Sequence, residues 1–523
     1  MCAWLIRLCA LVAVLGLGAC THSDLRPDYV RQPSTTIPAH ADAPLVANSA
    51  HLSAGHGDET GLRLLNDSVD ALLARIVLAD RAKYSIDLQY YLFHSDATGK
   101  LLAQHLLAAA DRGVRVRVLL DDLDKLGKDD VLRALDGHAH LEIRLFNPFH
   151  ERKSSFWSMG KQFAGDFGRL NRRMHNKTFI ADSAMAVVGG RNIGDEYFDA
   201  SGTSNFRDLD VLTVGPVVAE IGQSFDSYWN SAPSTPLAAF RHGPVDADKL
   251  AAIRKTLAEN ADEMRRTRYA DDVMARAEDL AREGPTGKWA WGTATYLADD
   301  PDKVDPEVNR RDLHMAPRIK AWLDTAQKQI LLVSPYFVPG DKGVGYLAQK
   351  RADGIEVSIL TNSLASTDAG NVYAAYASYR PKLLAAGVQL YELKPDAAHG
   401  KTQKRFIGSS SGSSSLHAKA MIVDDDHAFV GSMNLDPRSG NLNTEDGVIV
   451  TSPAFAQSLR DLFSLATTPA VSYQVLLKAD GKSVYWQTME NGETVIFEDS
   501  PRTSAWRRFK VGLTRMLPIE GLL

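Results

Sequence analysis

The chain is poor in cysteine, in excess charge of either sign and in long apolar runs. Its only cysteines, Cys2, Cys9 and Cys20, fall within the first twenty positions, so no disulfide can join distant parts of the body. The formal net charge is −5, which argues against the general basic surface of non-specific nucleic-acid binders. Beyond the N-terminus, no apolar run reaches the roughly 18 residues of a membrane-spanning helix.

The remaining composition is that of a large globular protein. The 523 residues exceed one typical domain, and the contents of 45% hydrophobic and 24% charged residues are ordinary for chains with buried cores. The length therefore predicts two large cores.

One motif occurs twice in the chain. Residues 174–182 read Met-His-Asn-Lys-Thr-Phe-Ile-Ala-Asp, and residues 416–424 read Leu-His-Ala-Lys-Ala-Met-Ile-Val-Asp, so both contain His-x-Lys-x4-Asp. Each copy is followed at the same interval by a glycine-containing tetrapeptide that ends in Asn, at 189–192 and 431–434. Two similar halves that each supply one histidine predict a single shared active site.

The surroundings of each motif predict a strand, a turn and a second strand. Side chains two positions apart on a strand point to the same face, so His175 should project with Lys177, and His417 with Lys419. An Asn side chain adds a neutral donor without adding charge. Such a cationic and nucleophilic face suits a phosphate group. The donors that we expect beside it are Asn192 and Asn434.

Alternating strand and helix patterns predict an α/β fold. In the first half the expected order is strand, helix, strand, and the second half repeats it. The expected elements are a strand at 84–91, a helix at 101–112 and a strand at 114–120, then a strand at 329–336, a helix at 345–351 and a strand at 355–360.

The N-terminus is similar to a bacterial lipoprotein signal. Arg7 precedes an apolar run that closes with Leu-Gly-Ala-Cys at 17–20. We expect cleavage before Cys20 and a lipid on its sulfur, which would hold the protein on a membrane of the bacterial cell envelope, facing the periplasm. A plain secretory signal cut near Ala19 and a short anchor are the alternatives, and Thr21 leaves inner and outer membrane open.

Composition shifts divide the chain into six parts. The C-terminal part contains turn signals typical of β-hairpins, then a stretch at 506–519 that mixes cationic and apolar residues; this stretch is either a membrane-surface helix or a helix packed on the body. The expected parts are a signal peptide at 1–19, a tether at 20–60, a first half at 61–235, a helical connector at 236–310, a second half at 311–470, and the hairpin and amphipathic segment at 471–523.

The duplicated motif resembles the signature of the phospholipase D superfamily. Longer phrases at 189–198, 361–368 and 434–439 resemble a narrower group, the C-type bacterial cardiolipin synthases. The resemblance extends from about residue 84 to the C-terminus. It implies two similar halves, each a mixed β-sheet flanked by helices, which form one pseudo-twofold active site within a monomer.

The resemblance also implies a phosphoryl transfer in two steps. One histidine attacks the phosphodiester to form a phosphohistidine, and the other protonates the departing alcohol. Following the usual order in the superfamily, His175 is the expected nucleophile and His417 the expected acid and base, although the reverse assignment stays open. Lys177 and Lys419 would hold the nonbridging oxygens with help from the two asparagines. Neither a cofactor nor a metal is implied.

Four carboxylates complete the expected site. Asp182 and Asp424 belong to the motif and are counted with its catalytic residues, although holding the structure of the site is the alternative role. In the superfamily a further acid orients each catalytic histidine. Glu445 matches that pattern well, whereas Asp208 is shorter and follows Phe206 where an Asn is usual.

Three functions remain open. The first is a phosphatidyltransferase that makes cardiolipin from phosphatidylglycerol and either phosphatidylglycerol or phosphatidylethanolamine. The second is a hydrolytic phospholipase D that releases phosphatidic acid. The third, a nucleic-acid phosphodiesterase, is disfavoured by the lipid signal and by the acidic balance of charge. The expected partners are phospholipids and a membrane surface and not nucleic acid, while the need for a small accessory protein stays open.

Overall fold

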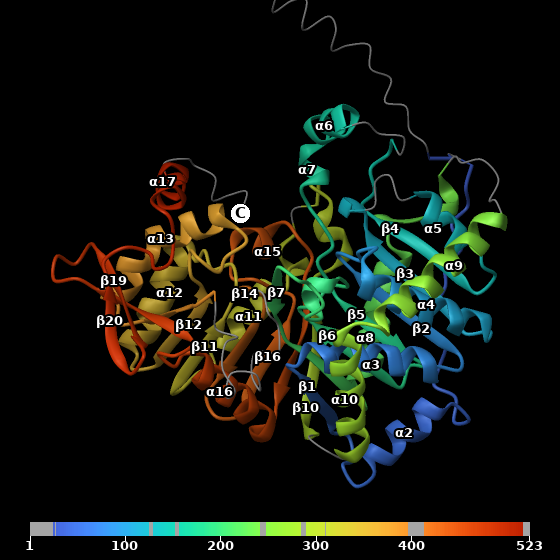
Figure 1. The fold of residues 1–523 in the computed structure, drawn as a ribbon, viewed down its shortest axis with the longest axis horizontal. Coiled ribbons are helices and arrows are strands. Elements are labelled where there is room, and N and C mark those ends of the chain that lie inside the picture. The colour runs from blue at the N-terminus through green and yellow to red at the C-terminus, as the bar shows by residue number, and fades with distance from the viewer. Residues whose placement is uncertain are drawn as a thin grey trace, which may run out of the picture.

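The computed structural model describes most of the chain after the N-terminus (Figure 1). The described residues are 25–26, 28–124, 129–151, 156–240, 247–283, 289–308, 310–395 and 413–515. The expected signal peptide and Cys20 lie outside them. Within the described part, no helix has the length and apolarity needed to cross a membrane.

The first half is built on a mixed sheet of eight strands. The central strands β2, β3 and β4 run parallel, and the flanking strands pair antiparallel. The order across the sheet is β1 (Thr60–Leu65), β8 (Asp210–Val214), β6 (Met185–Gly189), β5 (Thr178–Ala181), β2 (Ser85–Tyr90), β3 (Arg115–Asp121), β4 (Leu141–Phe146) and β9 (Ser234–Pro236).

The second half repeats this order and these directions. Its sheet runs β10 (Ala290–Ala298), β17 (Asp446–Thr451), β16 (His427–Gly431), β15 (Ala420–Val423), β11 (Gln329–Val333), β12 (Glu356–Asn362), β13 (Gln389–Leu393) and β18 (Ser472–Leu477). The corresponding strands β1 and β10 pair with each other antiparallel, which joins the two sheets about a pseudo-twofold axis. The predicted α/β fold of two similar halves is confirmed.

Helices cover both faces of the joined sheet. Residues four apart along α8 (Val217–Asn230) and along α16 (Pro453–Ala466) are apolar, and both helices bury that stripe in one central core with strands of both halves. The outer faces carry α3 (Ser68–Arg81) and α4 (Ala97–Asp111) on the first half, and α12 (Gly340–Ala352) and α13 (Gly370–Ala385) on the second. The halves therefore share a core in addition to their own.

The expected connector is not helical throughout. Its helices α9 (Ala247–Met264) and α10 (Arg268–Glu283) pack on the first half, where the Asn260 amide donates to the carbonyl of Ala97 at 3.0 Å. Strand β10 lies inside the expected range 236–310 but belongs to the sheet of the second half. The charged composition of the two preceding helices led to a helical prediction for the whole range, and the strand was not predicted.

Much of the expected tether packs against the first half. Buried arginines of the sheet bind its backbone: Arg117 donates to the carbonyl of Ser34 at 2.9 Å, and Arg144 donates to that of Gln32 at 2.7 Å. The helix α2 (Pro44–Ser53) then buries Leu45. The segment predicted as a tether over 20–60 is therefore not free of the body from Leu25, the first described residue, onward: Leu25 bridges to Phe240, and Arg26 N donates to the carbonyl of Ala239 at 2.9 Å. These partners lie far away in sequence, so the segment needs no periodic pattern of its own.

The C-terminal hairpins are confirmed. Strands β18, β19 (Val484–Glu490) and β20 (Glu493–Phe497) pair antiparallel in sequence order. Gly481 and Asn491 take the left-handed backbone of tight turns, with φ of 66° and 52°. A last helix, α17 (Ala505–Thr514), packs beside α13. The remaining helices named in Figure 1 are α5 (Asp129–Asp136), α6 (Phe156–Gly165), α7 (Phe167–Leu170), α11 (Ala316–Leu323) and α15 (Pro437–Asn441).

Candidate active site

The two halves exchange backbone hydrogen bonds where their motifs meet. Strand β7 (Ser204–Arg207) of the first half pairs parallel with β14 (Ser413–Leu416) of the second, and a matching bridge joins Met174 to Thr444. His417 N donates to the carbonyl of Arg207 at 2.7 Å, and His175 N donates to that of Thr444 at 2.9 Å. Each histidine therefore lies beside the residue that precedes an acid of the other half.

Each motif histidine is paired with a carboxylate from the opposite half. His175 Nδ1 lies 2.8 Å from Glu445 Oε2, and His417 Nδ1 lies 2.5 Å from Asp208 Oδ2. The two histidines are 7% and 6% exposed, and both acids are buried. A carboxylate at Nδ1 fixes the tautomer and the orientation of the ring. The structure thus brings together the four residues that the sequence assigned to acid-oriented histidines.

Asp208 has a shorter side chain than Glu445, and the residue that contacts each acid differs between the two halves. A Cβ on Gly190 would lie 2.1 Å from Asp208 Oδ1, so this position accepts no side chain while Asp208 is in place. At the corresponding position of the second half, the Ser432 hydroxyl donates to Glu445 Oε2 at 2.6 Å. The second residue of each Gly-Gly or Gly-Ser pair is therefore adapted to the acid that it faces.

The motif lysines lie deep in the same place. Lys177 and Lys419 are each 1% exposed, and their ammonium groups donate to the carbonyls of His175 and His417. Lys419 Nζ also lies 2.7 Å from His417 Nδ1. The strands β5 and β15 begin after these residues, so each His-x-Lys occupies the segment before a strand rather than the strand itself.

One further carboxylate was missed by sequence reasoning. The Asp446 side chain accepts from the backbone N–H of Lys177 at 3.2 Å and from the Tyr296 hydroxyl at 2.9 Å. Burial raises its pKa, and burial lowers that of Lys177. Leu209 takes its place in the first half, so the duplicated pattern did not point to an acid at this position.

The two histidines differ in proton affinity. Burial first, and then the charges of Lys177 and Lys419, hold the pKa of His175 well below its usual value. Burial and Lys419 also lower the pKa of His417, but Asp208 opposes them there. Burial and the lysines thus favour the neutral form of His175, whereas at His417 the charge of Asp208 offsets part of the same effect.

The pKa values of the two partner acids, Asp208 and Glu445, are shifted in opposite directions. Burial acts to raise the pKa of Asp208, but Lys419 and His417 outweigh it and hold that pKa below its usual value. Burial raises the pKa of Glu445, against the opposing effect of Lys177. Asp208 is therefore the acid that more readily stays ionised and stabilises a positive charge on its histidine, His417.

Aromatic side chains enclose both histidines. The Tyr91 ring meets His175 edge to face at a centroid distance of 5.1 Å. Tyr197, in the short 3-10 helix η2 (Asp195–Tyr197), and Phe206 contact the His417 ring at 5.4 and 4.9 Å. Phe206, which stands where the superfamily usually has Asn, is thus part of the wall around His417.

The two asparagines are not equivalent. The Asn192 amide is engaged at both atoms, because its Nδ2 donates to the Tyr197 hydroxyl at 2.8 Å and its Oδ1 accepts from Leu92 N at 3.1 Å. Asn434 Oδ1 is buried and finds no hydrogen-bond partner among the described residues. Asn434 is therefore the one of the two whose side chain keeps capacity for a ligand, and Asn192 positions the wall around His417.

The motif aspartates lie at the other end of their strands, away from the histidines. The Asp182 carboxylate accepts backbone N–H groups of Lys83, Tyr84 and Ser85, at 2.7–3.2 Å. Asp424 accepts the corresponding N–H groups of residues 327–329, at 2.7–2.9 Å. We therefore correct their placement among the catalytic residues: both fasten the start of the neighbouring strand, β2 or β11.

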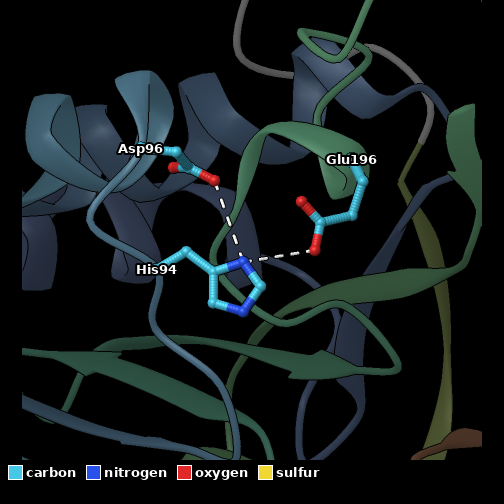
Figure 2. Close-up of side chains that lie close together, drawn as sticks. All are labelled: His94, Asp96 and Glu196. Carbon is cyan, nitrogen blue, oxygen red and sulfur yellow. Dashed lines mark ion pairs between the residues drawn. The ribbon is translucent and has the colours of Figure 1, made fainter. Parts of the chain in front are cut away.

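One group of side chains in the described residues has the composition of a metal site. Ligand atoms of His94, Asp96 and Glu196 lie within 4.8 Å of one another (Figure 2). Asp96, however, already accepts the N–H groups of Gly99 at 3.0 Å and Asp195 at 2.8 Å as the cap of α4. These bonds account for the cluster as a link between the 92–96 loop and η2.

Comparison with known proteins assigns the family. Residues 76–229 and 319–466 both match the family described as "Cardiolipin synthase, PLD-like domain". The chain belongs to this family. This PLD-like chain is 40% identical over 473 residues to cardiolipin synthase C of Escherichia coli K12, covering 90% of this chain and 98% of that protein. It is 35% identical over 466 residues to an uncharacterized protein of Helicobacter pylori J99, covering 88% and 89%.

A solved structure supports the fold of this PLD-like chain. The phosphatidylserine synthase of Haemophilus influenzae Rd KW20 superposes with a TM-score of 0.53 at 12% identity, covering 91% of this chain and all of that one. The family match confirms the resemblance drawn from the motifs, and the chain is an enzyme of the phospholipase D type.

Gly190→Ala should lower phosphodiester turnover by about 10²–10⁴-fold, because the added Cβ displaces Asp208 and leaves His417 without its orienting acid. Ser432→Ala removes one hydrogen bond to Glu445 and should cost less. Steady-state kinetics with thermal unfolding as a control for folding would check both. Wild-type turnover by a folded Gly190→Ala variant would contradict the role of Asp208.

Asp208→Asn should move the alkaline limb of the kcat profile to lower pH. Asp208 raises the pKa of His417, so its loss lowers that pKa further, and a general acid with a lower pKa loses its proton earlier as the pH rises. A shift of about 1–3 pH units is expected for loss of a close opposite charge. Movement of the acidic limb instead would assign the nucleophile to His417.

Proposed function

We propose that this protein is a phosphatidyltransferase that joins two phospholipids into cardiolipin. The donor is phosphatidylglycerol or phosphatidylethanolamine, and the acceptor is phosphatidylglycerol. The proposal is supported by the 40% identity to cardiolipin synthase C, which extends over 98% of that protein. The observation that carries it is the pair of buried histidines, each held by a carboxylate of the opposite half.

In the first step His175 is the nucleophile. Its ring nitrogen attacks the phosphorus of the donor, a P–N bond forms, and the P–O bond to the headgroup alcohol breaks. His417 gives its proton to the departing oxygen, so glycerol or ethanolamine leaves as a neutral alcohol group. The lowered pKa of His175 favours the neutral nucleophile, and Asp208 beside His417 favours the protonated acid.

In the second step the direction of proton transfer reverses. A hydroxyl of the acceptor phosphatidylglycerol attacks the phosphohistidine, His417 now takes the hydroxyl proton, and the P–N bond breaks. Two displacements in sequence retain the configuration at phosphorus. The site returns to its starting protonation state, so no external acid or base is consumed.

The lysines and Asn434 serve the phosphoryl group itself. Two buried ammonium groups beside the histidines can hold the nonbridging oxygens and balance the charge that develops during transfer. The Asn434 Oδ1, which has no partner among the described residues, can accept a hydrogen bond from a hydroxyl of the substrate.

Hydrolysis is the competing outcome at the same site. A phosphohistidine that meets water gives phosphatidic acid, so the acceptor alone separates a synthase from a hydrolytic phospholipase D. A nucleic-acid substrate is disfavoured by the net charge of −5. The enclosing aromatic rings and the low exposure of both histidines favour an acceptor that replaces water in the site.

We further propose that the protein works at a membrane surface, held by a lipid on Cys20 and by helix α17. Trp506, Phe509 and Leu513 are 63%, 60% and 57% exposed, and the first two rings stack on each other at 5.6 Å. Lys510 lies 5.2 Å from the Trp506 ring. Exposed aromatic and cationic residues on one short helix are typical of a surface that enters an anionic lipid interface. The helix projects from the edge of the second half (Figure 1).

Incubation of the protein with phosphatidylglycerol, alone and with phosphatidylethanolamine, should yield cardiolipin detectable by mass spectrometry. His175→Ala should reduce the yield by about 10²–10⁴-fold, because it removes the proposed nucleophile of the first step. Phosphatidic acid as the sole product would favour the hydrolase. A tryptic peptide carrying a phosphatidyl group on His175 after acid-free quenching would assign the nucleophile.

Trp506→Ala with Phe509→Ala should weaken binding to vesicles of phosphatidylglycerol by about tenfold or more, since each ring loses an apolar contact worth about 1.5–3 kcal/mol. Flotation measures the bound fraction, in a Cys20→Ser background that removes the lipid. The matched control is Met274→Ala, which changes a 59% exposed apolar residue on α10. Equal flotation of all three proteins would exclude a membrane role for α17.

A further inference from the structure

A cavity of about 260 Å³ opens within the first half, apart from the histidines. Helix α4 and strands β3 and β4 form one side, and helices α5 and α9 form the other. Nearly all of its wall is aliphatic. Representative lining residues are Leu106, Val118, Leu120, Leu132, Ile143 and Leu257.

The cavity results from how the helices of this half are spaced. Ala103 presents only a methyl group on the face that α4 turns to the cavity. On the opposite side α9, from the segment between the halves, is held over α4 by the bond from Asn260 to the carbonyl of Ala97. An apolar space of this size forfeits packing contacts when empty, and an apolar ligand restores them.

The cavity has a polar end at the loop that follows β2. Phe93, His94 and Lys100 line this end. His94 Nδ1 lies 3.3 Å from Glu196 Oε1 (Figure 2). Glu196 directly precedes Tyr197, whose ring contacts His417. A ligand that fills the cavity would therefore leave its polar end beside the wall of the active site.

We infer that this cavity binds one acyl chain of a phospholipid whose headgroup region reaches the two histidines. The inference rests on the proposed function. The apolar wall fits a fatty acyl chain, and the Lys100 ammonium can meet the anionic headgroup region. The carboxylates near the same end are already engaged: Asp96 accepts the N–H groups of Gly99 and Asp195, and Glu196 lies 3.3 Å from His94. The cavity then selects donors or acceptors by chain length, and the connector helix α9 is part of the substrate site.

Equilibrium binding to a series of lysophosphatidylglycerols with increasing chain length tests the cavity directly. Binding of monomeric ligand should tighten by about fourfold for each methylene that enters an apolar site, and then level off when the cavity is full. The same affinity for short and long chains would overturn the inference.

Two substitutions should move the plateau in opposite directions. Ala103→Phe fills the cavity, so the plateau should come at shorter chains, and long-chain ligands should bind at least about tenfold more weakly than to the wild type. Leu257→Ala enlarges the cavity, so tightening should continue to longer chains. Ala108→Phe is the matched control, because it adds the same ring to an exposed position of the same helix. An unchanged plateau in both cavity variants would also overturn the inference.

The binding and turnover assays separate this inference from the proposed function. Chain-length-dependent binding without conversion of any phospholipid would support the acyl cavity and contradict the proposed function. Cardiolipin formation with no dependence on chain length, and no effect of Ala103→Phe, would leave the function standing and remove the cavity.

Discussion

The exchange of a histidine and a carboxylate between the two halves is the constraint on which the rest of the structure depends. His175 is held by Glu445 and His417 by Asp208, all with little or no exposure. A buried imidazole that must carry a charge during reaction needs a compensating partner. Neither half contains that partner for its own histidine. The shared core of α8 and α16 and the pairing of β1 with β10 serve to hold these two pairs in register.

The two halves have the same order of strands, but several corresponding side chains at the active site differ. A shorter acid stands against a glycine in one half, and a longer acid against a serine in the other. One asparagine is bound on both ends while its counterpart keeps an unpaired oxygen. Asp446 has an aliphatic counterpart. The two histidines also differ in proton affinity, because Asp208 opposes burial and Lys419 at His417, whereas burial and both lysines lower the pKa of His175. A reaction with one nucleophile and one acid requires such a difference.

The parts that escaped prediction have a common physical reason. Residues 32–43 lack any periodic pattern, yet buried Arg117 and Arg144 bind their carbonyl groups from strands far away in sequence. Strand β10 follows two charged helices and pairs only with distant strands. The aromatic wall of Tyr91, Tyr197 and Phe206 is likewise assembled from separate segments. Local sequence shows periodicity and turn residues. It does not show which distant groups will form hydrogen bonds with a segment or pack against it.

By itself the sequence determined the duplication, the α/β alternation, the hairpin turns and the identity of the histidines, lysines and supporting acids, because each rests on spacing or on side-chain chemistry that is local. Only the tertiary structure decided that the acids cross between halves, that Asp182 and Asp424 fasten strands, and that Asn192 is already engaged. It also placed an apolar cavity beside the wall of His417. These features depend on long-range packing, which brings together residues that are far apart in the sequence.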